Sequence, residues 1–160
     1  MLAGLSTLKI RFGWGVETVA GQKPTTFKQL HRINSLDEIN IENEKIDASA
    51  LEDFVSRYIQ GRGDTGGSTT AGVNYTPETV AEWTEVIEAY NTAKASGKRI
   101  WFETIIPGFE EADFVVAQPP TKIPSPAKGQ NELLVVSMNL TIEEYVGLDT
   151  KVEFENTEEE

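Results

Sequence analysis

One glycine-rich stretch of the sequence has the spacing of a phosphate-binding loop. Residues 61–66 (GRGDTG) match the pattern G-x-G-x-x-G, in which glycines let the backbone approach a pyrophosphate at a helix N-terminus. The residues that follow, 67–72 (GSTTAG), do not favour the helix that such a site requires. No Gly-Lys-Ser or Gly-Lys-Thr sequence is present that would indicate a P-loop. We therefore interpret the stretch as a glycine-rich loop and its Arg-Gly-Asp tripeptide as a coincidence.

Few other residues have the types and spacing that catalysis or metal binding needs. His31 is the single histidine, so the usual multi-histidine zinc site cannot form, and no Gly-x-Ser-x-Gly sequence accompanies it. Adjacent acids occur at Glu110-Glu111 and Glu143-Glu144, and paired carboxylates could act in glycoside hydrolysis or hold a cation. Neighbours on a strand point to opposite faces, however. We expect no catalytic residue, no metal and no cofactor.

Composition limits the class of protein further. The chain has 160 residues, the length of one domain, and no cysteine that could form a disulfide or act as a nucleophile. Its 26 acidic and 14 basic side chains give a net charge of −12, which disfavours tight binding to nucleic acid phosphates. No stretch approaches the roughly 18 apolar residues of a membrane span, and residues 1–10 lack the features of a signal peptide. We expect synthesis in the cytoplasm, one domain over residues 1–154 and a disordered acidic tail over 155–160.

One amphipathic helix is predicted over residues 76–96. Thr76 can cap its N-terminus, Pro77 suits its first position, and Gly97 marks its end. Apolar residues then recur at spacings of three and four, which places them on one helix face. The predicted core face consists of Val80, Trp83, Val86, Ile87 and Tyr90.

Most other segments are rich in β-branched and aromatic residues and alternate in polarity, which predicts strands. Over Glu132–Ile142, for example, Val136, Met138 and Leu140 fall on one face, and Ser137 and Asn139 on the other. Because strands do not alternate with helices, a doubly wound α/β fold is disfavoured. The predicted class is β-rich (α+β), an antiparallel β-sandwich or barrel with one packed helix and a long glycine-rich loop at Gln60–Gly72. A second, proline-rich loop is expected at Gln118–Gln130. The remaining predicted strands are Leu8–Trp14, Gln29–Asn34, Glu38–Ile46, Phe54–Ile59, Thr69–Tyr75, Lys98–Ile106 and Ala112–Ala117.

The segment from Ile39 to Gly67 resembles a known family. Residues 46–53 (IDASALED) are followed by Tyr58-Ile59-Gln60-Gly61 and an acid at Asp64. This resembles the major tail tube proteins of long-tailed bacteriophages, which carry Ile/Val-Asp/Glu-x-Thr/Ser-x-Leu-Asp/Glu-Asp and then Tyr-Ile-x-Gly-x-x-Asp. The likeness in the order of elements extends over about residues 30–150.

The resemblance implies a structural subunit that assembles into stacked hexameric rings and forms the conduit for DNA ejection. The implied partners are copies of itself and other tail proteins, namely the tape measure, tail terminator and distal tail proteins, while DNA passes without specific binding. The location would be the virion tail, after synthesis in the host cytoplasm, with no membrane association. Inter-subunit contacts are expected from the N-terminal arm 1–15 and the loop 47–72, and lumen-facing strands at Glu38–Ile46 and Glu132–Ile142. The loop residues concerned are Asp47, Leu51, Asp53, Tyr58, Ile59, Gly61, Arg62, Gly63, Asp64, Gly66 and Gly67.

Two other functions remain open at this point. A related ring-forming protein, such as a tail terminator or a secretion-tube subunit, would share the sandwich design but differ in filament length. A small-ligand or carbohydrate-binding β-sandwich would use an exposed aromatic platform at Trp14 or Trp101. An enzyme is the class that the sequence favours least.

Overall fold

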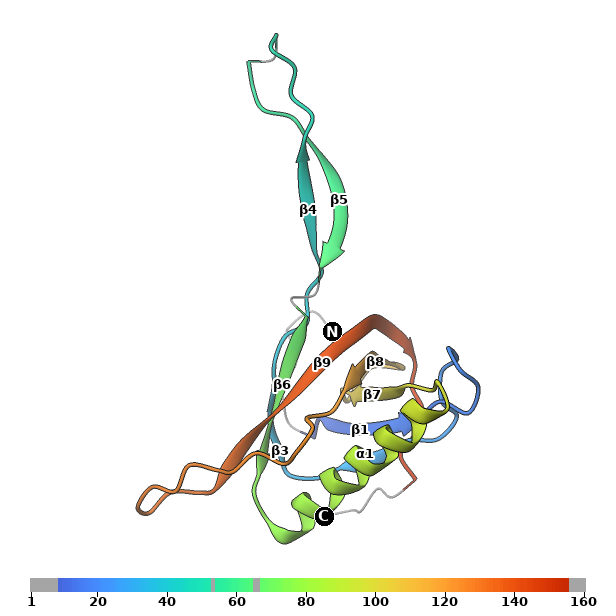
Figure 1. Cartoon of the computed structure of the whole chain (residues 1–160), viewed down its shortest axis with the longest axis vertical. Helices are drawn as coiled ribbons and strands as arrows, with labels where there is room; N and C mark the ends of the chain where they lie inside the picture. Colours follow the sequence, from blue (N-terminus) through green and yellow to red (C-terminus); the bar gives the residue numbers. More distant parts are fainter. Residues whose placement is uncertain (1–8, 53, 65–66, 156–160) are drawn as a thin grey trace.

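The computed structural model describes residues 9–52, 54–64 and 67–155. Figure 1 shows a body built on a curved antiparallel sheet, a helix packed on it, and a hairpin that rises from it. The helix is α1 (Pro77–Ala95), and the hairpin consists of β4 (Glu42–Asp47) and β5 (Tyr58–Asp64). The main sheet has seven strands in the order β2 (Lys28–Leu30), β1 (Arg11–Val16), β7 (Ile100–Ile105), β8 (Glu111–Gln118), β9 (Val135–Thr150), β6 (Ser68–Asn74) and β3 (Ile33–Leu36).

The sheet is curled so that its two edges meet at one corner. The edge strands β2 and β3 are consecutive in the chain, and only His31 and Arg32 lie between them. The long strand β9 passes from one half of the sheet to the other, because its first part pairs with β6 and its second part with β8. The result is a partly open antiparallel barrel with one helix, which confirms the predicted β-rich α+β class.

The main core fills the inside of this barrel. Alternate residues of β6 and β9 point inward, including Val73, Met138 and Leu140. The rings of Phe12 and Phe102 stack with centroids 5.5 Å apart, and Trp83 of the helix lies 6.3 Å from Phe102.

All three tryptophans are buried: Trp83 and Trp14, the latter 6% exposed, belong to the main core, and Trp101, 5% exposed, belongs to a second cluster described below. The proposed aromatic platform at Trp14 or Trp101 is therefore wrong, because neither ring is available to a ligand at the surface.

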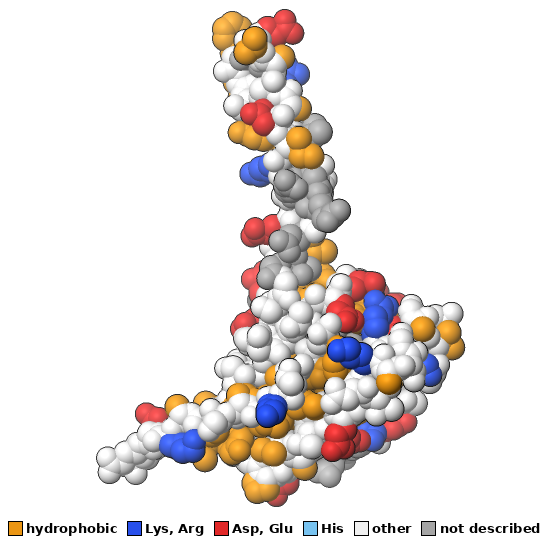
Figure 2. Space-filling model, in the orientation of Figure 1, with side chains coloured by type: hydrophobic (Ala, Val, Ile, Leu, Met, Phe, Trp, Pro, Cys, Tyr) orange, Lys and Arg blue, Asp and Glu red, His pale blue; other side chains and the backbone are white. Residues whose placement is uncertain are grey.

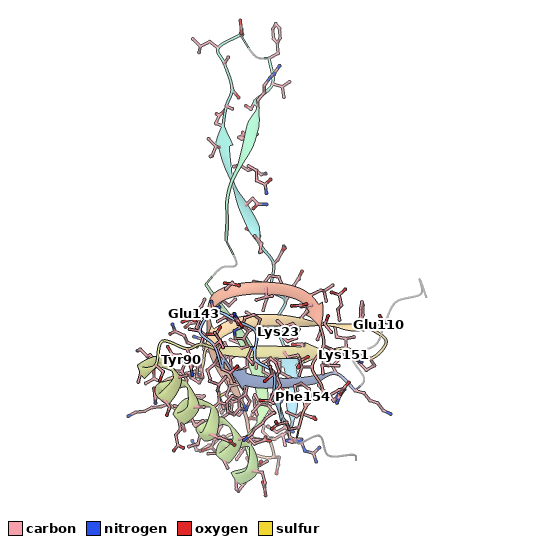
Figure 3. The ribbon with its side chains drawn as sticks, turned by 90° about the vertical axis from the view of Figure 1, so that its right-hand side faces the viewer. Lys23, Tyr90, Glu110, Glu143, Lys151 and Phe154 are labelled. Carbon is pink, nitrogen blue, oxygen red and sulfur yellow. The ribbon has the colours of Figure 1, made fainter. Side chains whose placement is uncertain are left out.

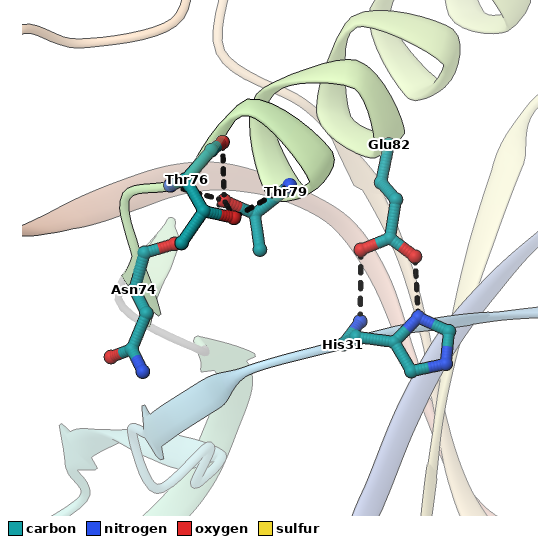
Figure 4. A network of polar contacts seen from close by, with 5 residues as sticks. All are labelled: His31, Asn74, Thr76, Thr79 and Glu82. Carbon is teal, nitrogen blue, oxygen red and sulfur yellow. Dashed lines mark hydrogen bonds and ion pairs between the residues drawn. The ribbon is translucent and has the colours of Figure 1, made fainter. Parts of the chain in front are cut away.

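The helix begins and ends within a residue of the predicted bounds because its signals are local. The Thr76 hydroxyl accepts from the Thr79 N–H at 3.2 Å, and the Thr79 hydroxyl accepts from the Thr76 N–H at 3.0 Å (Figure 4). Of the predicted core face, Trp83 and Val86 are fully buried, whereas Val80, Ile87 and Tyr90 are half-buried. Thr79 and Ala93 are buried as well.

A second apolar cluster lies on the other face of β7 and β8. Trp101 and Ile105 point into it from β7, and Phe114 and Val116 from β8. It is covered by Phe27 and by the C-terminal segment, where Val152 and Phe154 pack against it. The Glu155 N–H donates to the Phe27 carbonyl at 2.9 Å. Glu155, the first residue of the predicted acidic tail, is therefore hydrogen-bonded to the domain. The rest of the predicted acidic tail, 156–160, lies outside the described residues.

The predicted loop at Gln60–Gly72 is wrong, because most of it forms β5 and β6. Glycine serves there for close approach rather than for mobility. A Cβ on Gly72 would lie 2.3 Å from the Ser35 hydroxyl oxygen of β3, and one on Gly63 would lie 2.5 Å from Ile41 Cγ2. The proline-rich segment does form a loop, since no helix or strand lies between Gln118 and Val135.

Two more strand predictions need correction. Gln29–Asn34 is split into β2 and β3, because Arg32 has a φ of 58°, which interrupts an extended strand. In the segment Phe54–Ile59, the strand begins only at Tyr58 and continues to Asp64.

Candidate subunit interface on the projecting hairpin

The β4–β5 hairpin stands clear of the barrel. Its strands pair antiparallel from Glu42 opposite Asp64 to Asp47 opposite Tyr58, with an irregularity between Asn43 and Lys45. This pair forms a sheet of its own, separate from the seven-stranded sheet. In Figure 1 the hairpin extends away from the body along the long axis of the molecule. An isolated two-stranded hairpin is only marginally stable in water, so this element has little support from its own chain.

Hydrogen bonds hold the outer end of the hairpin in shape. The Ser49 N–H donates to Asp47 Oδ1 at 2.9 Å, and hydrogen bonds from Ser49 hold the pKa of the exposed Asp47 carboxyl below its usual value. Across the turn, the Ser49 hydroxyl accepts from the Arg57 N–H at 2.6 Å, and the Ala48 N–H donates to the Arg57 carbonyl at 2.8 Å. These hydrogen bonds hold the two arms of the hairpin together where the tip begins, so the tip projects from an ordered turn.

The tip carries apolar side chains that are exposed to solvent, next to the exposed Glu52. Leu51 and Phe54 are 108% and 105% exposed, and Val55 is 77% exposed. We call these three residues the apolar tip. In Figure 2 hydrophobic side chains gather at the far end of the arm, beside acidic ones. Single exposed apolar residues are ordinary, but a group of them at the end of an arm is typical of an interaction site.

The strands below the tip and Ile41, just before β4, add further exposed apolar side chains. Ile41 and Ile46 are each 45% exposed, and Tyr58 is 59% exposed. No side chain described between residues 40 and 64 is buried. The described side chains of the hairpin therefore form no core of their own, and its described apolar groups have no partner among the described residues of the barrel to cover them.

The structure brings together many of the residues that the resemblance singles out. Asp47 ends β4, Leu51 lies at the tip, and Tyr58, Ile59, Gly61, Arg62, Gly63 and Asp64 form β5. Gly67 immediately precedes β6. Asp53 and Gly66 lie outside the described residues. Phe54 and Val55 lie within the predicted contact loop 47–72 but are not among the residues singled out in it, and exposed Ile41, just before β4, lies outside that loop.

Two segments expected to make contacts or to face a lumen lie in different parts of the structure. Within the N-terminal arm 1–15, Phe12 and Trp14 are buried in β1, between β2 and β7, and residues 1–8 lie outside the described part, so the expected contacts of the arm stay a prediction. In the segment Glu38–Ile46, β4 belongs to the projecting hairpin and not to the main sheet, and its expected lumen-facing position stays a prediction.

The residues considered for chemistry do not come together as a site. The glycine pattern is followed by β6 and not by a helix, so the geometry of a dinucleotide site is missing. Glu110 and Glu143 are well separated in Figure 3, and Glu143 and Glu144 have different partners, Gln118 at 2.7 Å and Arg99 at 3.3 Å. His31 Nδ1 lies 2.5 Å from Glu82 Oε2, in a contact between the strand edge and the helix.

Among residues 9–52, 54–64 and 67–155, no group of three histidine, cysteine or acidic side chains is placed to hold a metal ion. In the same part of the chain, no helix has the length and apolar character needed to cross a bilayer.

Comparisons with known proteins give no family. No protein-family model matches the sequence, and no curated protein matches it. Among solved structures, this chain is similar to a chain described as "Cryo-EM structure of the anti-feeding prophage (AFP) baseplate, 6-fold symmetrised". The TM-score is 0.48 at 11% sequence identity, with 90% of this chain and 95% of that chain covered. At this TM-score the likeness supports no conclusion about function.

Proposed function

We propose that this chain is the structural subunit of a phage tail tube, which assembles into stacked hexameric rings around a conduit for DNA. Its role is assembly rather than catalysis. Its partners are copies of itself along the tube, together with the tape measure, terminator and distal tail proteins at the ends. It belongs to the virion tail after synthesis in the host cytoplasm.

The observation that carries the proposal is the apolar tip on an arm that stands clear of the body. Burial of a leucine, valine or phenylalanine side chain contributes about 1.5–3 kcal/mol, so the three tip residues favour a covered state. The tip lies far from the barrel of its own chain (Figure 1). A second molecule is therefore the simplest way to cover it.

The geometry of such a contact favours an extended assembly. If the tip binds a different surface of an identical copy, the contact is head-to-tail and repeats from one molecule to the next. Repetition of such a contact gives a ring if the rotation closes and a filament if it does not. A tube of stacked rings uses both kinds of contact.

The sequence motif supports the same element. Residues 46–52 run from the end of β4 into the tip, and residues 58–64 form the returning strand β5. The short motif that resembles tail tube proteins thus lies in the part of the chain that projects from the barrel.

A second exposed apolar segment could supply another contact. Leu133 is 72% exposed and Val135 is 44% exposed, where the proline-rich loop enters β9. In Figure 1 this loop forms a second projection, on the opposite side of the body from the end of the helix that leads into β7. Two separate projections suit a subunit with contacts both within a ring and between rings.

Electron microscopy of the purified full-length protein, alone and with its tail-initiation partners, tests the proposal. We expect long tubes of uniform diameter from the wild-type protein. The double variant Leu51→Asp/Phe54→Asp should stay monomeric, because it places two charges where apolar groups must be covered. Val19→Asp is the matched control, since Val19 is 54% exposed but lies in the loop after β1, and it should assemble normally.

The outcomes separate the alternatives. Single rings that never stack would indicate a terminator-like protein instead. Wild-type protein that remains monomeric even with its partners, or tubes formed equally well by the tip variant, would contradict the proposal.

A further inference from the structure

A short segment after β9 covers the second apolar cluster without joining the main sheet. Residues 151–155, called the strap below, form no strand and make one isolated bridge, in which Phe154 runs parallel to Phe27. The Phe154 side chain is buried, and its ring lies so close to Gly13 of β1 that no Cβ would fit there. Phe154 and Lys151 are labelled in Figure 3. Side-chain packing and a few hydrogen bonds therefore hold the strap in place.

The strap lies over a buried carboxyl group. Glu103 is fully buried on β7, and the register places it between Gly13 of β1 and Phe114 of β8, on the face that carries the second apolar cluster. Its Oε2 accepts from the Val152 N–H of the strap at 2.8 Å. Its Oε1 is buried and has no hydrogen-bond partner among the described residues. One of the two carboxyl oxygens is therefore unsatisfied beneath the strap.

The cations near Glu103 are engaged with other carboxylates. The pairs are Lys23 with Asp149 at 3.7 Å, Arg11 with Glu153 at 3.2 Å, and Lys151 with Glu153 at 3.7 Å. Lys23 also donates to the Thr150 carbonyl and lies 4.2 Å from the centre of the Phe114 ring. Within the described part of the chain, none of these cations forms an ion pair with Glu103.

The surroundings of Glu103 therefore disfavour its charged form. Burial raises the pKa of Glu103 from 4.5 to about 7, and the charge of Glu153 adds to this rise. The Val152 N–H and the charges of Lys23 and Arg11 oppose the rise without cancelling it.

We propose that the strap opens as Glu103 loses its proton, and that opening uncovers the second apolar cluster. An ionised carboxylate is costly to bury unless hydrogen-bond partners replace its water, and the single N–H of Val152 leaves Oε1 without one. The neighbouring strands β1, β7 and β8 belong to the seven-stranded sheet, whose backbone hydrogen bonds would have to break to admit water. The strap has no such ladder, so it is the wall that moves.

Proton linkage sets the direction and the size of the effect. The closed state keeps the proton of Glu103 up to about pH 7, whereas the open state returns its pKa to the ordinary value of 4.5. The equilibrium constant for opening should therefore rise from about pH 4.5, by at most roughly tenfold per pH unit, and level off above about pH 7. The strap and Glu103 belong to one chain, so this inference does not depend on the proposed tube.

Hydrogen–deuterium exchange of the strap amides in the full-length protein, read by mass spectrometry at pH 5.5 and pH 7, tests the inference. Glu103→Gln is the decisive variant, because glutamine keeps an oxygen for the Val152 N–H and does not titrate. Glu111→Gln is the matched control, because it removes an exposed carboxyl group from the adjacent strand β8. The intrinsic exchange rates of the strap are the same in all three proteins, so they cancel when the proteins are compared. Glu103→Met, which does not titrate either, decides the matter if Glu103→Gln does not fold.

We expect the opening constant of the wild-type strap, divided by that of Glu103→Gln, to increase about tenfold from pH 5.5 to pH 7. Glu111→Gln should behave as wild type does. The strap amides of wild type should also exchange faster than those of Met138 and Leu140 in β9, because the strap opens without unfolding of the barrel.

Two results would overturn the inference. An equal pH dependence of strap exchange in wild type and the non-titrating variant would show that Glu103 does not control the strap. Strap amides as well protected as those of Met138 and Leu140 at both pH values would show that the strap stays closed, with Lys23 turned to neutralise Glu103.

Discussion

Glu82 binds His31 with both oxygens of its carboxylate: Oε1 accepts from the His31 N–H at 3.1 Å, and Oε2 lies 2.5 Å from His31 Nδ1 (Figure 4). His31 is one of the two residues that join the edge strands β2 and β3. The helix therefore holds the corner where the curled sheet comes together, and this contact assigns the single histidine a structural role.

Replacing Glu82 should destabilise the barrel. In Glu82→Gln the charged acceptor is lost from a half-buried pair, and a hydrogen bond to a charged group contributes roughly 1.5–3 kcal/mol. We expect the free energy of unfolding in urea to fall by about 2 kcal/mol. The control Glu85→Gln removes an exposed ion pair with Lys28 at 2.7 Å and should cost less than about 1 kcal/mol. Equal effects of the two variants would contradict the role given to Glu82.

Glu103 should make the stability of the protein fall as pH rises. It is fully buried in β7, and burial raises its pKa from 4.5 to about 7, although Oε2 accepts from the Val152 N–H at 2.8 Å and Lys23 lies nearby. The folded state thus keeps a proton that the unfolded state has lost. The free energy of unfolding should be highest below about pH 4.5 with respect to this group and decline until about pH 7, by at most roughly 3 kcal/mol.

Urea unfolding of wild type and Glu103→Gln at pH 5 and pH 7.5 checks this. The glutamine at position 103 does not titrate, so the free energy of unfolding of the variant should change less between the two pH values than that of wild type. The same pH dependence in both proteins would show that Glu103 is not the cause.

Glu17 should act in the opposite direction. It is 1% exposed, and burial tends to raise its pKa, but donors from Trp101, Gly21 and Arg99 outweigh burial and hold the pKa below 4.5. Trp101 Nε1 donates at 2.8 Å and the Arg99 N–H at 2.8 Å. Stability from this group is present above the unfolded pKa of about 4.5 and is lost as pH falls through the lower folded value.

We expect Glu17→Ala to lower the free energy of unfolding by about 2–4 kcal/mol at pH 7, because the buried donors lose their acceptor. The fluorescence of Trp101 should change as well, since its indole N–H loses its partner. Unchanged stability and fluorescence would show that water replaces the carboxylate at no cost.

The elements that the sequence predicts well are those with local signals. Thr76, Pro77 and Gly97 delimit the helix within one residue, since capping depends on neighbours in the chain. Alternation predicts the buried side of β9, where Val136, Met138 and Leu140 face the core. Neither prediction requires knowledge of distant contacts.

The errors arise where a distant partner decides the structure. Glycine at positions 61–72 indicates a loop locally, but β5 and β6 form there because Gly63 and Gly72 allow side chains of Ile41, Asn34 and Ser35 to lie close. The break at Arg32 depends on the two sheet edges having to meet.

The candidate interface was only partly predictable for a similar reason. The motif from Asp47 to Asp64 marks the segment, but nothing in the alternation of Phe54 and Val55 indicates that these side chains lack a covering layer. Their exposure follows from the hairpin leaving the barrel, which is a property of the whole topology.

A cryo-EM reconstruction of the wild-type protein in its assembled state tests the central claim most directly. We predict a tube in which Leu51, Phe54 and Val55 of every subunit are buried against another copy of the chain. A reconstruction in which the hairpin tip remains in solvent, or folds back onto its own barrel, would contradict the account.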